Sequence, residues 1–239
     1  MASVSPSAKD AAAYLRRLGA LTQLDPEEIS MLEAAASGAM LVPARKQIVG
    51  DNDPVKQPRL LLSGWAARVR DFSDGRRQIL HVLLPGDLID LWQQRASAGP
   101  SAVVALTDAR VVAAPCPLGP ETGLARAYAL SAEIERGYLF RQIARLGRLD
   151  AYERLADLLL EIYDRLRLAG LAESYRFPLP MTQEMLADSL GLTSVHLNRT
   201  LQLMRREGVL ELRGNIVRLI EPHRLGEMVE HHDMPIRLT

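Results

Sequence analysis

Between residues 182 and 206, polar side chains recur with the types and the spacing that DNA recognition requires. Leu197, Leu201 and Met204 follow one another at i, i+4 and i+7 and predict the buried face of a helix over 194–206. The opposite face would present a mostly polar set that suits base edges and phosphates: Ser194, Val195, His196, Asn198, Arg199 and Gln202. The pattern predicts a recognition helix that lies against duplex DNA.

A shorter helix before it is predicted to hold this recognition helix in place. Thr182 is a candidate N-cap, and the small Ala187 would let the two helices cross closely. Gly191 permits a sharp turn, and Thr193 is the candidate N-cap of the recognition helix. The two helices would then form a helix-turn-helix.

Two short strands are expected after the recognition helix, over 209–213 and 216–220, with Gly214-Asn215 as a tight turn. Arg213 and Arg218 on this wing suit contacts to phosphates. The small residue, the glycine turn and the wing together favour DNA binding over a purely structural helical hairpin. A protein–protein adaptor is the weaker alternative, and its binding would not weaken steeply with salt.

Upstream, from about Met40 to Val112, short apolar runs alternate with turns such as Ser73-Asp74-Gly75 and Pro85-Gly86-Asp87. Regular spacing of this kind predicts an antiparallel sandwich. The stretches 67–70 and 77–82 alternate polar and apolar residues, as expected for half-buried strands.

A long amphipathic helix is expected from near Glu121, with a break at Gly147 and a second helix over 152–168. Its broad apolar face must be covered, either by a second subunit, which we favour, or by the sandwich of the same chain. The predicted fold is α+β: helices and a β-sandwich over 1–120, a dimerisation helix over 121–148, and a winged helix-turn-helix over 149–239. Earlier, Asp25-Pro26-Glu27-Glu28 predicts a helix start with a capping box, with Ile29, Leu32 and Ala36 buried.

The order of these elements resembles the CRP/FNR superfamily of bacterial transcription regulators, from about Leu18 to Ile220. The stretches that carry the resemblance are Leu62-Ser-Gly-Trp, Asp74-Gly-Arg-Arg-Gln-Ile-Leu, Leu84-Pro-Gly-Asp and the helix-turn-helix. The resemblance implies a jelly-roll sandwich like a cyclic-nucleotide-binding domain, pairing of two subunits through the long helix, and RNA polymerase as a partner.

Two departures from this family narrow the expected mechanism. The candidate effector pocket comprises Gly86, Asp87, Leu88, Ser101 and Ala102. Pro100, however, stands where cyclic-nucleotide binders of the family have a phosphate-binding arginine. Arg95 is the nearest arginine in the sequence that could replace it. Because a buried phosphate would lack its countercharge, the effector is not expected to be cyclic AMP, and the protein could act without an effector. In the recognition helix, Val195 replaces a glutamate common in the family, whereas Arg199 matches the arginine that reads guanine.

Other chemistries are weaker candidates. A haem- or redox-controlled sensor would use Cys116 or His81, but a single cysteine excludes an iron–sulfur cluster. His231-His232-Asp233 lacks metal-site spacing and is expected to be a solvated tail. A set of carboxylates interleaved with arginines is expected on a solvent face: Glu133, Glu135, Asp150, Glu153, Asp157 and Glu161.

Composition sets the remaining bounds. The chain has 239 residues, of which 48% are hydrophobic and 24% charged, and a formal net charge of +0, so DNA binding would require locally clustered cations. Without a signal peptide or membrane segment, a cytoplasmic protein is expected. We found no nucleophile–base arrangement, phosphate loop or metal motif and expect neither an enzyme nor a cofactor.

Overall fold

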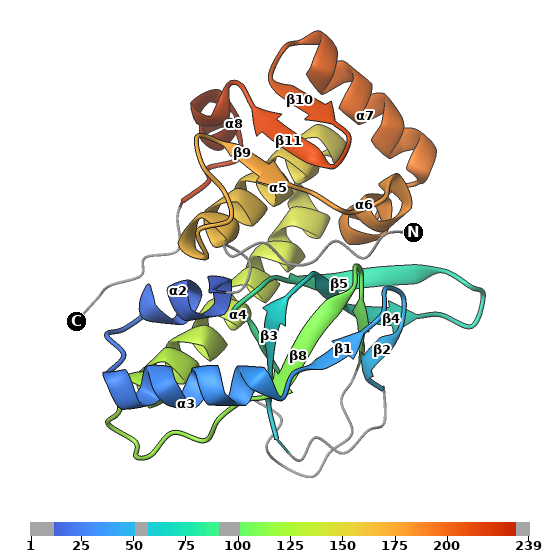
Figure 1. The fold of residues 1–239 in the computed structure, drawn as a ribbon. Helices are drawn as coiled ribbons and strands as arrows, with labels where there is room; N and C mark the ends of the chain where they lie inside the picture. The colour runs from blue at the N-terminus through green and yellow to red at the C-terminus, as the bar shows by residue number, and fades with distance from the viewer. Residues whose placement is uncertain (1–11, 51–56, 91–100, 233–239) are drawn as a thin grey trace.

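The computed structural model describes residues 12–50, 57–90 and 101–232 (Figure 1). Pro100, Arg95 and Asp233 therefore lie outside the described residues. Within the described ranges, no helix is long and apolar enough to cross a membrane.

Two four-stranded antiparallel sheets form the expected sandwich. The first, in the order β1-β8-β3-β6, comprises β1 (Met40–Val42), β8 (Ala109–Ala113), β3 (Arg59–Ser63) and β6 (Leu88–Ile89). The second, in the order β2-β7-β4-β5, comprises β2 (Gln47–Val49), β7 (Ala102–Ala105), β4 (Ala66–Asp71) and β5 (Arg77–Leu83). Side chains of both sheets, Leu61 and Ile89 on one and Leu83 and Val103 on the other, share the core between them.

The alternation in β4 and β5 does not predict which polar residues reach solvent. Arg68 and His81 lie directly opposite each other across the two strands and are only 3% and 6% exposed. The register shifts by one residue just after this pair. One face of the sheet packs on the other sheet and its opposite face on the C-terminal helices, so both faces are buried. Alternation indicates exposure only where one face of a sheet meets water.

Two N-terminal helices, α2 (Ala13–Gly19) and α3 (Pro26–Ser37), lie beside the sandwich and the long helix α4 (Gly123–Arg148). The expected capping box at Asp25 and Glu28 is present, and Glu28 also accepts a hydrogen bond of 2.6 Å from the backbone N–H of Leu124 at the start of α4. Leu32 is buried as expected, but Ile29 is 36% exposed. The α3 helix thus positions the long helix as well as covering the core.

The long helix ends one residue after Gly147, close to the expected break. Its last residue is Arg148, and a capping box of Asp150 and Glu153 then starts α5 (Ala151–Leu168). The remaining elements are β9 (Arg176–Pro178), α6 (Gln183–Leu190), α7 (Ser194–Arg206), β10 (Leu210–Arg213), β11 (Ile216–Leu219) and α8 (Pro222–Met228).

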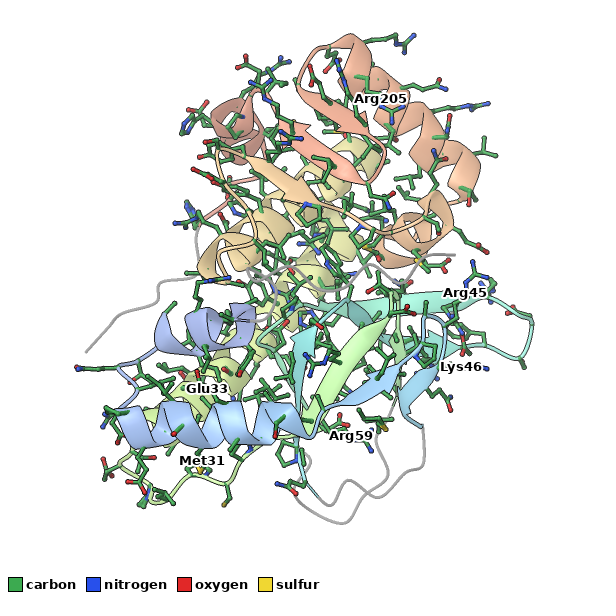
Figure 2. All side chains as sticks on the ribbon, viewed as in Figure 1. Met31, Glu33, Arg45, Lys46, Arg59 and Arg205 are labelled. Atoms are coloured by element: carbon green, nitrogen blue, oxygen red, sulfur yellow. The ribbon has the colours of Figure 1, made fainter. Side chains whose placement is uncertain are left out.

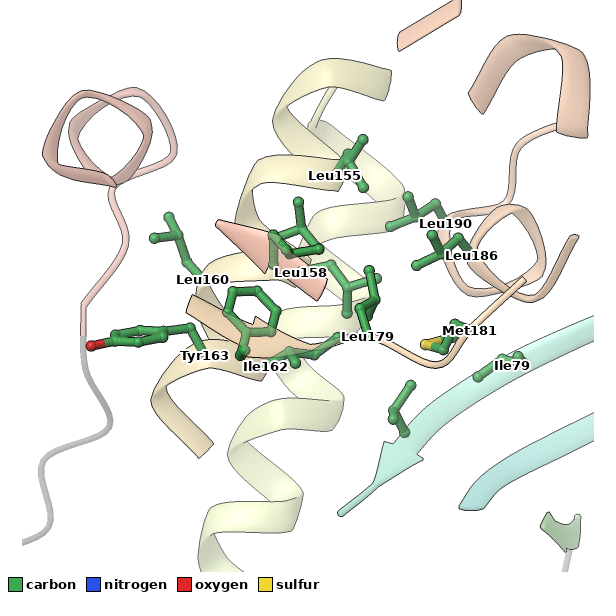
Figure 3. Packing of buried hydrophobic residues seen from close by; sticks show 14 of the residues in the cluster. Ile79, Leu155, Leu158, Leu160, Ile162, Tyr163, Leu179, Met181, Leu186 and Leu190 are labelled. Atoms are coloured by element: carbon green, nitrogen blue, oxygen red, sulfur yellow. The ribbon is translucent and has the colours of Figure 1, made fainter. Parts of the chain in front are cut away.

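The C-terminal elements are packed against the sandwich. Ile79 of β5 belongs to the same hydrophobic cluster as Leu158 of α5, Leu186 of α6 and Met181, which precedes α6 (Figure 3). Polar contacts reinforce this junction, because Gln78 donates to the carbonyl of Asp188 at 2.6 Å and Gln142 of α4 donates to that of Ser189 at 2.7 Å. The α6 helix is therefore held by both the sandwich and the long helix.

Candidate DNA interface and sensor core

The helix-turn-helix has the predicted bounds and caps. The Thr182 hydroxyl accepts a hydrogen bond from the backbone N–H of Met185 and starts α6, and Thr193 accepts one from His196 and starts α7. Gly191 ends α6 in the left-handed conformation, with φ of 61°. Because a side chain is disfavoured at that φ, glycine allows the tight turn that sets the angle between the two helices.

The recognition helix α7 buries Leu197, Leu201 and Met204 as predicted. Ser194, Val195, His196, Arg199 and Gln202 are exposed, and Asn198 is half-buried. The amide of Asn198 donates to Gln183 of α6 at 3.0 Å and accepts from Gln202 at 2.9 Å. Asn198 therefore links the two helices, whereas Arg199 is exposed beside it with a guanidinium suited to a guanine edge.

At the far end of α7, Arg205 lies at the opposite end of the molecule from the sandwich (Figure 2). It belongs to the last turn of the helix, as does Arg206, and both are exposed. The recognition helix thus carries several exposed arginines although the whole chain is neutral. DNA binding requires such a local cluster of positive charge.

The wing contains one strand more than the sequence predicted. β10 and β11 form the expected hairpin around Gly214-Asn215, and β9 adds a third strand on the other side of β11. Arg213 is exposed next to the turn, and Arg218 and Arg176 are exposed directly opposite each other on β11 and β9. These three arginines make no ion pair with the described residues.

Of the five residues expected to line an effector pocket, Asp87 and Leu88 border one small cavity, and Gly86, Ser101 and Ala102 are not among its lining residues. Asp87 accepts hydrogen bonds of 2.8 Å from the Leu84 backbone N–H and 2.5 Å from Arg165 of α5. Ser101 is buried next to Arg68. Gly86 packs on Arg17 of α2 and has φ of 95°, Leu88 belongs to the core shared with α2 and α4, and Ala102 belongs to the cluster that reaches α5.

Arg68 occupies the sandwich interior. Its Nη2 atom donates to Asp90 Oδ1 at 2.8 Å, its Nη1 atom lies 3.5 Å from Ser101 Oγ, and Nη2 lies 3.9 Å from Glu135 Oε1 of α4. The side chains of Arg68 and Asp90 are 4% and 2% exposed. The arginine therefore joins the sheet to the long helix through charged groups shielded from water.

A second buried network joins the sandwich to α5. Arg165 donates to the carbonyl of Val82 at 2.8 Å and pairs with Glu161 at 3.2 Å, besides its bond to Asp87. Its guanidinium carbon lies 4.8 Å from the centre of the Tyr138 ring, in cation–π geometry. His81 stacks on the same ring at 6.1 Å; burial and the nearby Arg165, Arg68 and Arg145 charges lower the pKa of His81 well below 6.5.

A cavity of about 10 Å³ remains between these groups, lined by Arg17, His81, Asp87, Tyr138 and Arg165 among others. Such a volume holds about one water molecule. A nucleotide or a haem is far larger than this cavity, and the His81 side chain beside it is buried. Cys116, the other haem candidate, is exposed beyond the end of β8.

Several carboxylates expected on a solvent face are buried. Arg145 of α4 donates to Asp157 at 2.8 Å and to Glu161 at 2.5 Å, and these two carboxylates and Glu135 are 3–8% exposed. The helices α4 and α5 meet through these charges, which α-helical periodicity alone does not reveal. Asp150 and Glu153 form the α5 capping box, and Glu133 is an exposed partner of Arg136 at 3.9 Å.

Of the expected solvated tail, His232 is exposed but His231 is packed against α5. His231 Nε2 lies 2.7 Å from Asp164 Oδ2, and Nδ1 lies 3.4 Å from Asp157 Oδ1. Burial alone would lower the pKa of His231, but the hydrogen bonds to these aspartates raise it above its usual value. Among the described residues, no group of three or more His, Cys, Asp or Glu side chains is arranged to hold a metal ion.

Sequence patterns did not identify Arg68, Arg165, Tyr138 and Arg145 as members of these networks. For Arg68, one available signal was its place within an otherwise apolar stretch, Ala66-Ala67-Arg68-Val69. A charged residue in such a place requires a partner. The partner itself comes from a distant segment, so its identity required the tertiary structure.

Comparisons with known proteins agree with this architecture. The model of the Crp-like helix-turn-helix domain matches residues 153–228. The nitrogen fixation regulation protein FixK of Azorhizobium caulinodans is 30% identical over 185 residues, which are 74% of this chain and 73% of that protein. The transcriptional activatory protein AadR of Rhodopseudomonas palustris is 27% identical over 218 residues, 90% of each chain. The solved structure of FixK2 from Bradyrhizobium japonicum is similar with a TM-score of 0.69 and 27% identity, over 82% of this chain and 99% of that one.

Proposed function

Because the chain belongs to the CRP/FNR family of transcription regulators and carries the family's helix-turn-helix DNA-binding domain, we propose that it binds a pseudo-palindromic DNA site as a homodimer. The single observation that carries the proposal is the capped recognition helix α7, which exposes Ser194, His196, Arg199 and Gln202 along one face. In helix-turn-helix proteins such a face enters the major groove.

Contacts within this interface divide into two kinds. Arg199 would read a guanine through its O6 and N7 atoms. Thr182, Thr193 and Arg213 lie at helix starts and at the wing turn, where they would contact phosphates and set the register. Val195 is 63% exposed and offers a base edge only apolar contact, which suits a thymine methyl group.

The long helix supplies the proposed subunit interface. Five exposed residues of α4 follow one another at i, i+3, i+7, i+10 and i+14, which is coiled-coil spacing: Glu133, Arg136, Phe140, Ile143 and Gly147. Phe140 and Ile143 are 64% and 68% exposed in the single chain. A second copy of the same helix would cover this stripe in a two-fold arrangement.

The proposed regulator works in the cytoplasm, has RNA polymerase as its partner on DNA, and is not controlled by cyclic AMP. The last point is supported by the described part of the sandwich, where Arg68 and Asp90 take up the space beside Ser101 and the cavity next to Asp87 is about 10 Å³.

Selection of operators from random DNA, followed by footprinting, tests the proposal. Two protected half-sites with centres about 34–36 Å apart are expected on a pseudo-palindrome. Affinity should fall steeply with salt, because bound phosphates release counterions. A single protected half-site, or no enriched sequence at all, would contradict the proposal.

A further inference from the structure

Arg68 lies inside the sandwich, between Asp90 and Ser101. It points to the same side of the sheet as its cross-strand neighbour Val103, whose side chain belongs to the core between the two sheets. Ser101, expected to line an effector pocket, lies beside its guanidinium instead. The sandwich interior is thus filled by a side chain of the protein itself.

The partner of Arg68 is held in an uncommon backbone conformation. Asp90 has φ of 62° and is 1% exposed. A non-glycine residue with positive φ is uncommon, and such strain persists where surrounding structure enforces it, often at functional positions. Here the conformation directs a carboxylate at Arg68, at 2.8 Å.

On α4, the residue that faces Arg68 belongs to a buried polar stripe. Glu135, Tyr138, Gln142 and Arg145 follow at i, i+3, i+7 and i+10 and so lie along one side of the helix. Tyr138 contacts Arg165, Gln142 donates to the backbone of α6, and Arg145 pairs with two carboxylates of α5. One stripe of one helix therefore contacts Arg68 near its start and the DNA-binding domain further along.

We propose that the Arg68 side chain takes the place of a small-molecule effector inside the sandwich. Paired with Asp90 and facing Glu135, it holds α4 in the position that the DNA-binding domain requires. This inference rests on the proposed DNA-binding function. A displacement of Glu135 would move the rest of the rigid helix, including the residues that hold α5 and α6.

The proposal is tested with the full-length protein and its selected operator. Wild-type protein, dialysed free of small molecules, is expected to bind the operator without additives. Arg68→Ala should bind about 5- to 150-fold more weakly, the usual range of coupling between sites. Arg70→Ala is the matched control, because Arg70 lies two residues further along the same strand and is exposed, and it should retain the wild-type affinity.

A small cation that binds in the space left by the Arg68 side chain distinguishes a loss of coupling to the DNA-binding domain from a loss of folding. Guanidinium ion at low millimolar concentration should restore operator binding to Arg68→Ala, whereas sodium chloride at equal ionic strength should not. Far-UV circular dichroism and the thermal unfolding midpoint establish that each variant is folded at the temperature of the binding measurement. A folded Arg68→Ala whose affinity stays within twofold of the wild type would overturn the proposal.

Two near-isosteric variants keep the proposal testable if Arg68→Ala does not fold. Asp90→Asn removes a charge while the new side chain tolerates the left-handed backbone, and Glu135→Gln removes the charge on α4. Both are expected to weaken operator binding without guanidinium rescue, and wild-type affinity in both would overturn the inference. If wild-type protein itself enriches no DNA sequence, the proposed function fails instead; if it binds only after a small molecule is returned, this inference alone fails.

Discussion

Arg165 of α5 donates a hydrogen bond of 2.5 Å to Asp87 in the turn before β6, and this pair joins the DNA-binding domain to the sandwich. The side chains are 2% and 14% exposed. Arg165 also bonds the Val82 carbonyl, so one guanidinium bridges a helix of one domain and two segments of the other. The pair fixes the approach of α5 to the sheet, which hydrophobic packing alone would specify less closely.

Arg165→Met should lower the free energy of unfolding by about 3–5 kcal/mol, because it leaves Asp87 without its buried partner. Urea unfolding monitored by circular dichroism measures the change. Arg213→Met, a change at an exposed arginine of the wing, should change stability by less than about 0.5 kcal/mol. Similar small effects for both substitutions would mean that solvent or another cation replaces Arg165 at Asp87.

Arg199→Ala should weaken operator binding by about 1–3 kcal/mol and flatten the preference at one base pair in each half-site, because the bidentate contact to guanine is lost. Titration against operators that carry all four base pairs at each position measures both effects. Arg205→Ala is the matched control: it removes another exposed arginine of α7 and should weaken binding equally on every sequence. A uniform loss for Arg199→Ala would reduce that residue to a phosphate contact.

The helix-turn-helix could be predicted closely because its signals are local. Leu197, Leu201 and Met204 repeat within one helix, and Thr193 and Gly191 act on adjacent backbone. The strands of the sandwich could be predicted for the same reason, since turns such as Ser73-Asp74-Gly75 separate them in the sequence.

The charged interior could not be predicted because its partners are distant in the chain. Arg68 and Glu135 are 67 residues apart, and Arg165 and Asp87 are separated by 78. The interleaving of carboxylates with arginines assigned Glu135, Asp157 and Glu161 to solvent, since a helix face with many charges is usually exposed. Burial of that face depends on which elements pack on it, and this is a property of the tertiary structure.

Ile143→Asp should convert the proposed dimer into a monomer, because a carboxylate would have to be buried in the seam between two α4 helices. Analytical ultracentrifugation measures the mass, and operator affinity should fall with it. Leu118→Asp is a suitable control, since Leu118 is 63% exposed but lies outside α4. If Ile143→Asp remains dimeric, the subunits must pair through another surface.

The two buried histidines should give stability a maximum near pH 6.5, because their pKa values shift in opposite directions. Hydrogen bonds to Asp157 and Asp164 outweigh the effect of burial and raise the pKa of His231. Its contribution is complete below the unfolded value of about 6.5 and is lost as the pH rises through the higher folded pKa. Burial lowers the pKa of His81, so the unfolded chain binds a proton there first, and stability falls as the pH drops below about 6.5.

Urea unfolding midpoints between about pH 5 and pH 9 separate these contributions. His231→Gln should remove the loss on the alkaline side, and His81→Gln should reduce the loss on the acid side. His232→Gln, a change at the exposed neighbour of His231, should keep the wild-type profile. An alkaline slope that persists in His231→Gln would show that the contacts with Asp157 and Asp164 do not favour the protonated imidazole. The hydrogen bonds of His231 to these aspartates would then involve its neutral form.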